Sequence, residues 1–160
     1  MLAPAIYFKE EIIQEFKRLF YSDELYYYMG CHENGLPNIV DEDNNDLRQY
    51  AILNSEQEPI GYFSYHIDRY SSNVSRFGLI SFSDYLQPFI VDDVLKEMKM
   101  LINKFHRIEW YMVGNNPIKK HYDKFCKKYK GRMIELRDVF KDNDGNYINS
   151  YIYEIITKKG

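Results

Sequence analysis

The chain has 160 residues, a size typical of one domain, and 45% of them are hydrophobic, which is enough to form a core. Aromatic residues make up 17% of the sequence and exclude an intrinsically disordered chain, because large apolar groups offset the entropy that ordering costs. The net charge of −3 argues against nucleic-acid binding and against an acidic membrane surface as partner, since both favour a basic excess.

The N-terminal part, residues 1–48, is predicted to be helical and then polar. Residues 8–20 form a helix, because the apolar residues Phe8, Ile12, Ile13, Phe16, Leu19 and Phe20 recur at helical spacing. Ser22 is expected to cap a second short helix that ends before Gly30, and residues 41–46 form an acidic loop. The apolar face of the first helix needs a partner, so residues 1–160 are expected to form a single domain.

Three strands are expected next, at residues 49–53, 60–68 and 74–83. Polar turns separate them, and these connections are too short for crossovers, so the three strands should form an antiparallel meander.

A strand–helix–strand unit follows the meander. Its helix is predicted over residues 91–105, where apolar residues recur at i, i+3, i+4 and i+7, and the strand after it covers residues 107–113. This order implies a parallel crossover. A second amphipathic helix runs from Pro117 to Tyr129, and a hairpin of residues 132–140 and 147–156 closes the chain. The elements predict an α/β (α+β) domain with a mixed, mostly antiparallel sheet flanked by helices.

Cysteine and histidine usage gives no sign of a disulfide framework or a metal site. Cys31 and Cys126 suit reduced thiols in the cytoplasm, and the four histidines lack the spacing of zinc ligands, so we expect no metal. The sequence has no run of 18 apolar residues and no signal-peptide pattern at its start, so we expect a cytoplasmic protein without a membrane span.

The segment from Val113 to Phe125, VGNNPIKKHYDKF, resembles the GNAT acetyltransferase superfamily, in which an Asn follows the fifth strand and a Tyr comes seven residues later. Asn115 and Tyr122 hold those positions. The segment Pro59 to Tyr65 is similar to the third strand of that family, and the closing hairpin also fits. Together these likenesses cover about two-thirds of the chain.

The resemblance implies a six- to seven-stranded sheet whose fourth and fifth strands, the parallel central pair, splay apart to accept the pantetheine arm of acetyl-CoA. It implies that Tyr122 is the general acid that protonates the leaving thiolate, and that an amine acceptor attacks directly, without an enzyme nucleophile. The cofactor-binding residues that it implies are Ile80, Ser81, Phe82, Ser83, Asn115, Ile118 and Lys124. Tyr122 could instead only pack on the sheet, and Asn115 could only cap the following helix.

The general base for the amine is left open among His66, Asp68 and Glu109, and each of these could equally be an ordinary polar residue of a strand. The acceptor is expected to be a small-molecule or peptide amine, which the acidic run at 41–46 could attract. The last hairpin offers an edge for a homodimer.

A basic cluster at residues 119–132 could hold the phosphates of CoA or could be a solvated helix face. A third alternative, RNA binding, is disfavoured because no aromatic residues alternate with the basic ones as in known RNA-binding modules.

One segment departs from the GNAT pattern. The family binds pyrophosphate through a glycine-rich loop at the start of a helix, but residues 83–93 contain no glycine, and Pro88 lacks an N–H. Asp92 and Asp93 put negative charge at the N-terminal end of that helix, where the family places a diphosphate. The alternative is therefore a non-catalytic GNAT-fold binding module that has lost acetyl-CoA binding, with Phe82, Tyr85 or Phe89 filling the gap between the strands.

Overall fold

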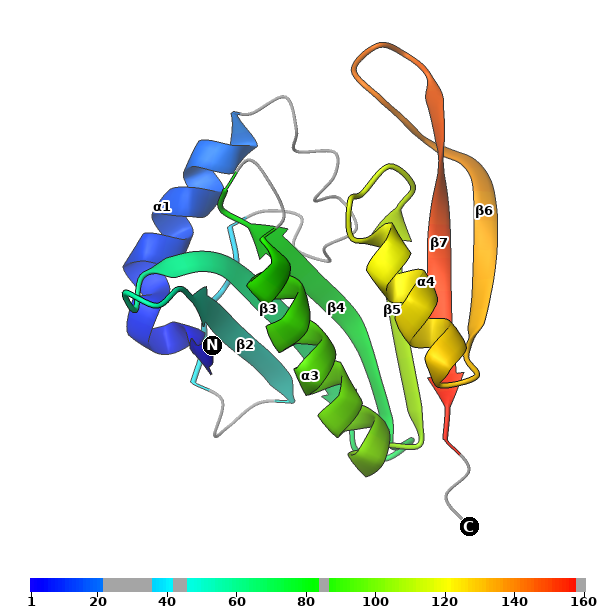
Figure 1. Ribbon diagram of the computed structural model, residues 1–160. Helices are drawn as coiled ribbons and strands as arrows, with labels where there is room; N and C mark the ends of the chain where they lie inside the picture. Colours follow the sequence, from blue (N-terminus) through cyan, green and yellow to red (C-terminus); the bar gives the residue numbers. More distant parts are fainter. Residues whose placement is uncertain (22–35, 42–45, 84–86, 158–160) are drawn as a thin grey trace.

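The computed structural model of the chain describes residues 1–21, 36–41, 46–83 and 87–157 (Figure 1). The predicted helix after Ser22, Cys31, Tyr85 and most of the acidic run lie outside these residues.

A seven-stranded sheet forms the centre of the molecule, in the order β1-β2-β3-β4-β5-β7-β6. Its strands are β1 (Leu2–Pro4), β2 (Leu47–Leu53), β3 (Pro59–Asp68), β4 (Asn73–Ser81), β5 (Arg107–Val113), β6 (Arg132–Lys141) and β7 (Tyr147–Ile156). Every neighbouring pair is antiparallel except β4 and β5, which are parallel. The predicted mixed, mostly antiparallel sheet with a parallel central pair is therefore confirmed.

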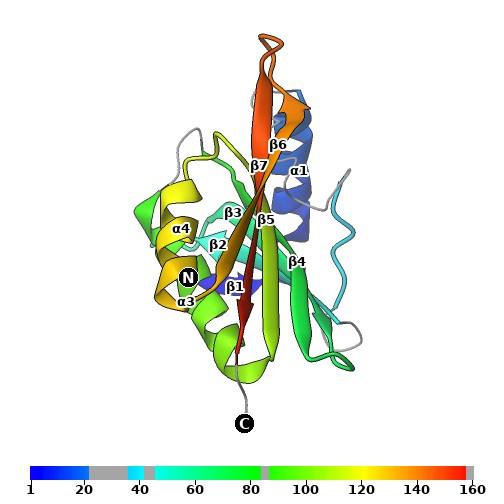
Figure 2. The same cartoon turned by 90° about the vertical axis from the view of Figure 1, so that its right-hand side faces the viewer.

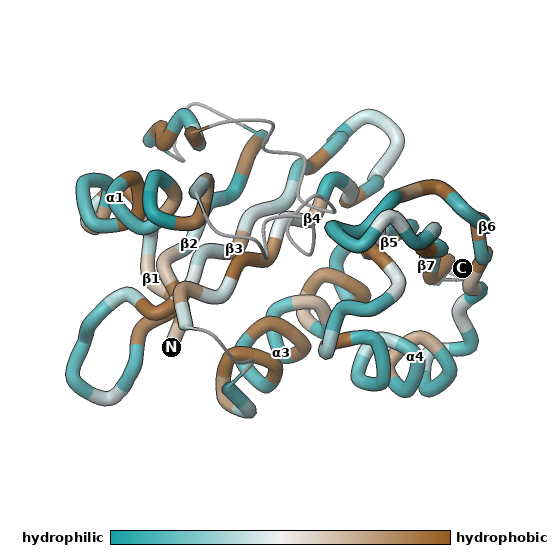
Figure 3. Tube along the Cα trace, turned by 90° about the horizontal axis from the view of Figure 1, so that it is seen from above, coloured by the Kyte–Doolittle hydropathy of each residue, from teal (hydrophilic) through white to brown (hydrophobic). Residues whose placement is uncertain are grey.

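Helices cover both faces of this sheet (Figures 2 and 3). A 3-10 turn (η1, Ala5–Phe8) leads into α1 (Lys9–Phe20) on one face, while α3 (Pro88–Lys104) and α4 (Lys119–Lys128) lie side by side on the other. In α1, two glutamates in the first turn and Lys17 and Arg18 in the last complement the helix dipole.

Each face has its own apolar core. Under α1, the buried residues Ile12 and Phe16 pack with Tyr62 and Phe82 of the sheet side. Under α3 and α4 lies a larger cluster, which includes Phe63, Val94, Met98, Ile108, Trp110, Tyr122 and Tyr153. Because successive side chains of a strand point to opposite faces, each strand from β2 to β4 supplies residues to both clusters.

Most predicted bounds agree with the structure within three residues, and two differences have a physical reason. Strand β1 was not predicted, because three residues are too few to show a pattern and their pairing with β2 supplies the order. Helix α3 begins at Pro88 rather than at Val91. Proline fits the first helical position, where its missing N–H has no partner to lose.

Across the described residues, no helix combines the length and apolar composition that a membrane crossing requires.

Candidate active site

Strands β4 and β5 are neighbours for only a short distance. Their parallel pairing consists of Asn73 with Arg107 and Val74 with Ile108, whereas β5 pairs with β7 at seven positions. Beyond Val74 the two strands diverge toward their C-terminal ends (Figure 1). The splayed pair at the centre of the sheet is therefore present.

A β-bulge lies where the strands separate. Arg76 has a φ of 54°, in the left-handed region, and the register between β3 and β4 shifts between Ser64 and His66. Bulges bend the strand that carries them and increase its twist. The bulge thus turns β4 away from β5 just after their last paired residue.

The gap is edged by backbone groups of β4. The amide of Phe82 donates to the carbonyl of Ile60 in β3, and in an antiparallel strand alternate residues direct their backbone groups to the same neighbour. Ile80 and Phe82 therefore face β3, while Leu79 and Ser81 face the gap. Arg18 of α1 donates to the carbonyl of Phe82, so both backbone groups of that residue are already used.

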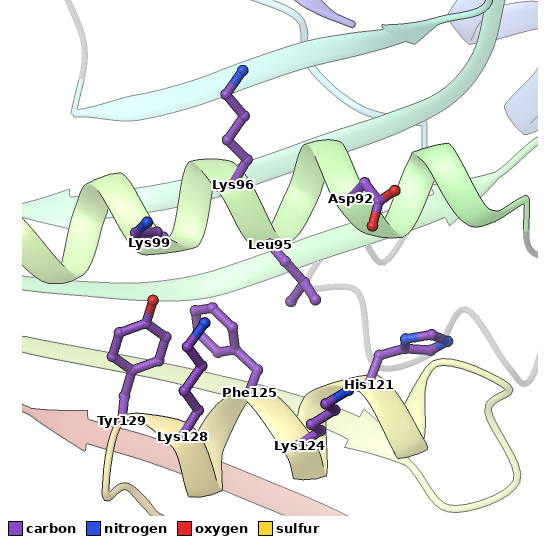
Figure 4. A pocket seen from close by; sticks show the side chains of 9 residues that line it. All are labelled: Asp92, Leu95, Lys96, Lys99, His121, Lys124, Phe125, Lys128 and Tyr129. Atoms are coloured by element: carbon purple, nitrogen blue, oxygen red, sulfur yellow. The ribbon is translucent and has the colours of Figure 1, made fainter.

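A groove of about 370 Å³ lies between α3 and α4, on the face of the sheet opposite α1 (Figure 4). Its walls are side chains from both helices: Asp92, Leu95, Lys96, Lys99, His121, Lys124, Phe125, Lys128 and Tyr129. Leu95 and Phe125 make its apolar part, and in Figure 4 the hydroxyl of Tyr129 points toward α3. The groove thus combines an apolar surface with charged side chains around it.

The charge of the groove is opposite to that of the whole chain. Four lysines and one aspartate line it, whereas the chain carries −3. Lys124 and Lys128 come from the basic cluster that the sequence indicates, but Lys96 and Lys99 of α3 join them only in the fold. A cluster of lysines in a concave site attracts phosphate groups.

Tyr122 lies on the buried face of α4, under the groove rather than in its wall. Its ring packs edge-on against Trp110, with centroids 5.7 Å apart, and against Tyr153 at 6.0 Å. The side chain is 5% exposed. The phenol is therefore held in the layer between α4 and the sheet.

Comparisons with known proteins agree with this geometry at the level of the fold. No protein-family model matches the sequence, and no curated protein matches it. Spermidine N-acetyltransferase from Vibrio cholerae, solved with CoA and spermine, aligns with a TM-score of 0.62 at 11% identity, over 93% of this chain and 92% of that one. A Chromobacterium violaceum protein assigned to the GNAT family aligns with a TM-score of 0.57 at 16% identity, over 92% and 83%.

This chain has the GNAT acetyltransferase fold. A further solved structure of that fold is the microcin C7 self-immunity acetyltransferase MccE, bound to acetyl-CoA and AMP. It aligns with a TM-score of 0.63 at 14% identity, over 98% of this chain and 91% of MccE.

The three candidate bases lie near the closed end of the gap of this GNAT fold. Glu109 follows Ile108, the last residue of β5 that pairs with β4, and alternation directs it to the face opposite α3 and α4. It pairs with Arg107. His66 is half-buried, pairs in register with Ser75 of β4 and faces the same side as Glu109.

Asp68 organises the turn between β3 and β4. It accepts hydrogen bonds from the hydroxyl and amide of Ser71 and from the amide of Tyr70, and these hold the pKa of Asp68 below its usual value. This is a structural role, so Asp68 is the least suited of the three bases.

The two aspartates of α3 lie further from the helix start than the sequence suggests. Because the helix begins at Pro88, Asp92 and Asp93 lie in its second turn, and the first turn holds no acidic residue. Asp93 forms an ion pair with the amino group of Met1, and Asp92 lines the groove. The expected negative charge at the helix terminus is thus shifted by one turn.

The turn before α4 is closed by Asn116 rather than by Asn115. The side chain of Asn116 accepts a hydrogen bond from the amide of Ile118 at 3.1 Å, while Asn115 is exposed. Ile118 is buried in the core under α4, and Lys124 lines the groove. Of these residues, only Lys124 directs its side chain into the groove.

The sequence named Phe82 and Phe89 as residues that could fill the gap between β4 and β5, and both side chains lie elsewhere. Phe82 packs against Phe16 on the α1 face, with ring centroids 6.3 Å apart, and Phe89 is 39% exposed at the start of α3. Within the described part of the chain, no group of three or more His, Cys, Asp or Glu side chains is arranged to hold a metal ion.

Proposed function

We propose that this protein is an N-acetyltransferase that transfers the acetyl group of acetyl-CoA to a primary amine. The observation that carries the proposal is the early end of β4–β5 pairing beside a lysine-lined groove. Solved proteins of the same fold, including the spermidine N-acetyltransferase and MccE, were crystallised with CoA or acetyl-CoA, which supports this reading.

The residues present fit acetyl-CoA in two parts. The pantetheine arm would pair with the backbone of Leu79 and Ser81 along the gap, in the manner of an added strand. The phosphates would be held by the ammonium groups of Lys96, Lys99, Lys124 and Lys128, in place of the backbone N–H groups that a glycine-rich loop would supply.

The chemistry needs no enzyme nucleophile. The amine nitrogen forms a bond to the acetyl carbon while the carbon–sulfur bond breaks, and Tyr122 gives its proton to the departing thiolate. The proton of the attacking amine passes to a base. Glu109 and His66 are the candidates, because they face the side of the sheet opposite the groove, so donor and acceptor would approach from opposite faces.

The first test measures acetyl-CoA binding by thermal unfolding. At a concentration one hundred times the Kd, acetyl-CoA should stabilise the fold by about 2.7 kcal/mol, or about 5–10 °C for a chain of this size. Acetyl-pantetheine, which lacks the nucleotide phosphates, should bind more weakly. The variant Lys96→Gln/Lys124→Gln should lose affinity for acetyl-CoA about tenfold or more but keep its affinity for acetyl-pantetheine.

Lys127→Gln is the matched control for this variant. It changes the same charge on α4 at an exposed position outside the groove, so it should leave both affinities unchanged. A protein that acetyl-CoA does not stabilise at millimolar concentration would contradict the proposal.

The second measurement concerns turnover of a panel of amines. Tyr122→Phe should lower kcat about 100-fold or more without weakening acetyl-CoA binding. Tyr129→Phe is the control, because it deletes the hydroxyl of a nearby tyrosine that lies on the groove wall (Figure 4). This variant should keep the kcat of the wild type. If Tyr129→Phe is the variant that lowers kcat, the acid has been assigned to the wrong tyrosine.

A second candidate function is a non-catalytic binding module with this fold. It is favoured by the glycine-free segment at residues 83–93, by Asp92 in the groove, and by the burial of Tyr122. It predicts no acetylated product from any amine, whether or not acetyl-CoA binds, so the turnover assay separates the two functions.

A further inference from the structure

Helix α4 depends on its neighbours for its position. It has ten residues and no side-chain hydrogen bond at its N-cap, and helices of this length are marginal on their own in water. The orientation of any side chain on α4, Tyr122 included, is therefore set by what the helix is fastened to.

Helix α4 is held to the sheet by the buried hydroxyl of Tyr153 on β7. This hydroxyl donates to Asp123 Oδ1 at 2.6 Å, and the ε-ammonium group of Lys119 donates to Asp123 Oδ2 at 2.8 Å. Burial alone would raise the pKa of Asp123, but the bonds from Lys119 and Tyr153 outweigh it and hold that pKa below its usual value. The carboxylate thus stays ionised and keeps both donors at neutral pH.

The same Tyr153 also touches the ring of Tyr122. Tyr153 and Trp110 stack almost parallel, with centroids 5.1 Å apart and 7° between their planes. Tyr122 meets both members of this stack edge-on, at 61° to Tyr153 and 65° to Trp110. Tyr153 therefore holds α4 through its hydrogen bond to Asp123. It also holds the ring of Tyr122, the residue before Asp123, by direct contact.

Further contacts connect Lys119 of α4 to the closing hairpin. The ammonium group of Lys119 lies 4.4 Å from the ring centroid of Tyr151, and the Tyr151 hydroxyl donates to Glu135 of β6 at 2.9 Å. Tyr151 is partly exposed, and its hydroxyl is bonded to β6 rather than to α4, so it offers a matched control.

We propose that Tyr153 and Asp123 are positioning residues that hold the phenol of Tyr122 in its catalytic orientation, an inference that rests on the acetyltransferase function proposed above. Both act through Tyr122 rather than on the substrate. Removing the Tyr153 hydroxyl should loosen Tyr122 while leaving the groove and its lysines intact.

The test combines kinetics with a double-mutant cycle. Tyr153→Phe keeps the stacked ring but deletes the hydroxyl, and it should lower kcat about tenfold with the KM for acetyl-CoA changed less than twofold. Asp123→Asn should do the same from the helix side. In a Tyr122→Phe background, Tyr153→Phe should have no further effect on kcat, because its role is exercised through the missing phenol. Tyr151→Phe, a hydroxyl deletion on the same strand, should leave kcat unchanged.

Ring dynamics give a readout that does not need activity. In protein labelled with ¹³C on the tyrosine rings, the Tyr122 signal, assigned by its loss in Tyr122→Phe, should show slow ring flips that become faster in Tyr153→Phe. An unchanged flip rate, or a kcat loss that adds fully to that of Tyr122→Phe, would overturn the positioning role. Faster flips in a protein that binds no acetyl-CoA would uphold the positioning and overturn only the proposed function.

Discussion

The two halves of the sheet are built differently. Strands β2, β3 and β4 carry buried side chains on both faces, under α1 and under α3. Strands β5, β7 and β6 are covered by α4 on one face, and in β6 nine of ten residues are exposed, with only Phe140 half-buried. The first half has apolar burial on both faces. In the second half the apolar core lies under α4, and ionic and hydrogen-bonded contacts such as those of Glu154 and Asp123 add to it.

The gap between β4 and β5 lies where these halves meet. In the function proposed above, the first half supplies the backbone that pairs with the pantetheine arm, while the second half supplies Glu109 and Tyr122.

The largest loss of stability should come from truncating a buried apolar residue of the first half, and an apolar residue of the exposed strand β6 is its comparison. Phe63 in β3 is fully buried, so Phe63→Ala should lower the free energy of unfolding by about 3–5 kcal/mol. Met133 in β6 is 44% exposed, and Met133→Ala should change it by less than about 0.5 kcal/mol. Urea unfolding measures both, and similar losses would break the distinction between the halves.

Replacements of two glycines in the second half should show how tightly that half is packed. A Cβ on Gly131, between α4 and β6, would lie 2.5 Å from the carbonyl oxygen of Glu154 and 2.7 Å from Cys126 Sγ. Gly131→Ala should therefore cost about 2–3 kcal/mol of unfolding free energy. A Cβ on Gly145 at the hairpin turn would make only an ordinary contact, 3.9 Å from Lys141 Cε, but the φ of Gly145 is 85°, so Gly145→Ala should cost about 1 kcal/mol. If the order of these two losses were reversed, backbone strain would outweigh packing here.

The smallest of these effects concerns the ionic contacts of the second half. Glu154 receives hydrogen bonds from Arg107 at 2.9 Å and from Arg132 at 2.8 Å, and its side chain is 12% exposed. The bond from Arg107 is the main reason why the pKa of Glu154 is lowered. Glu154→Gln should cost about 1–2 kcal/mol of unfolding free energy at pH 7.

The pH dependence of this loss has a definite sign. A carboxylate whose pKa is lowered on folding stabilises the fold above its unfolded pKa of about 4.3, and this contribution disappears as the pH falls through the lower folded value. Wild type and Glu154→Gln should therefore differ at pH 7 and converge below about pH 4 in urea unfolding. A constant difference across this range would mean that the substitution acts through packing instead.

Much of the fold could be predicted from the sequence, because long amphipathic patterns dictate it. The apolar spacing in α3 and the short connections of the meander specify the order of elements and the parallel pair. The end of α4 was predicted within one residue, at Tyr129 rather than Lys128, but the role of Gly131 after it depends on the fold. Lys130 holds the left-handed position with a φ of 55°, so Gly131 is required for close packing rather than for its conformational freedom.

The site could be predicted only in part. Lys124 and Tyr122 follow from a motif within one helix, but the pairing of Lys96 and Lys99 with α4 depends on how two helices pack. Sequence spacing defines neighbours on a single helix and carries no information on which lysine faces another helix. The same limit applies to Tyr153, which lies on another element, β7, and meets the ring of Tyr122 only in the folded protein.

The most direct test of the account is a crystal structure of the protein soaked with acetyl-CoA. We expect the pantetheine arm in the gap between β4 and β5, its amides paired with the backbone of Leu79 and Ser81, and the phosphates beside Lys96 and Lys124. Acetyl-CoA bound elsewhere, or an empty gap at saturating concentration, would contradict the central claim that the divergence of these strands forms the cofactor site.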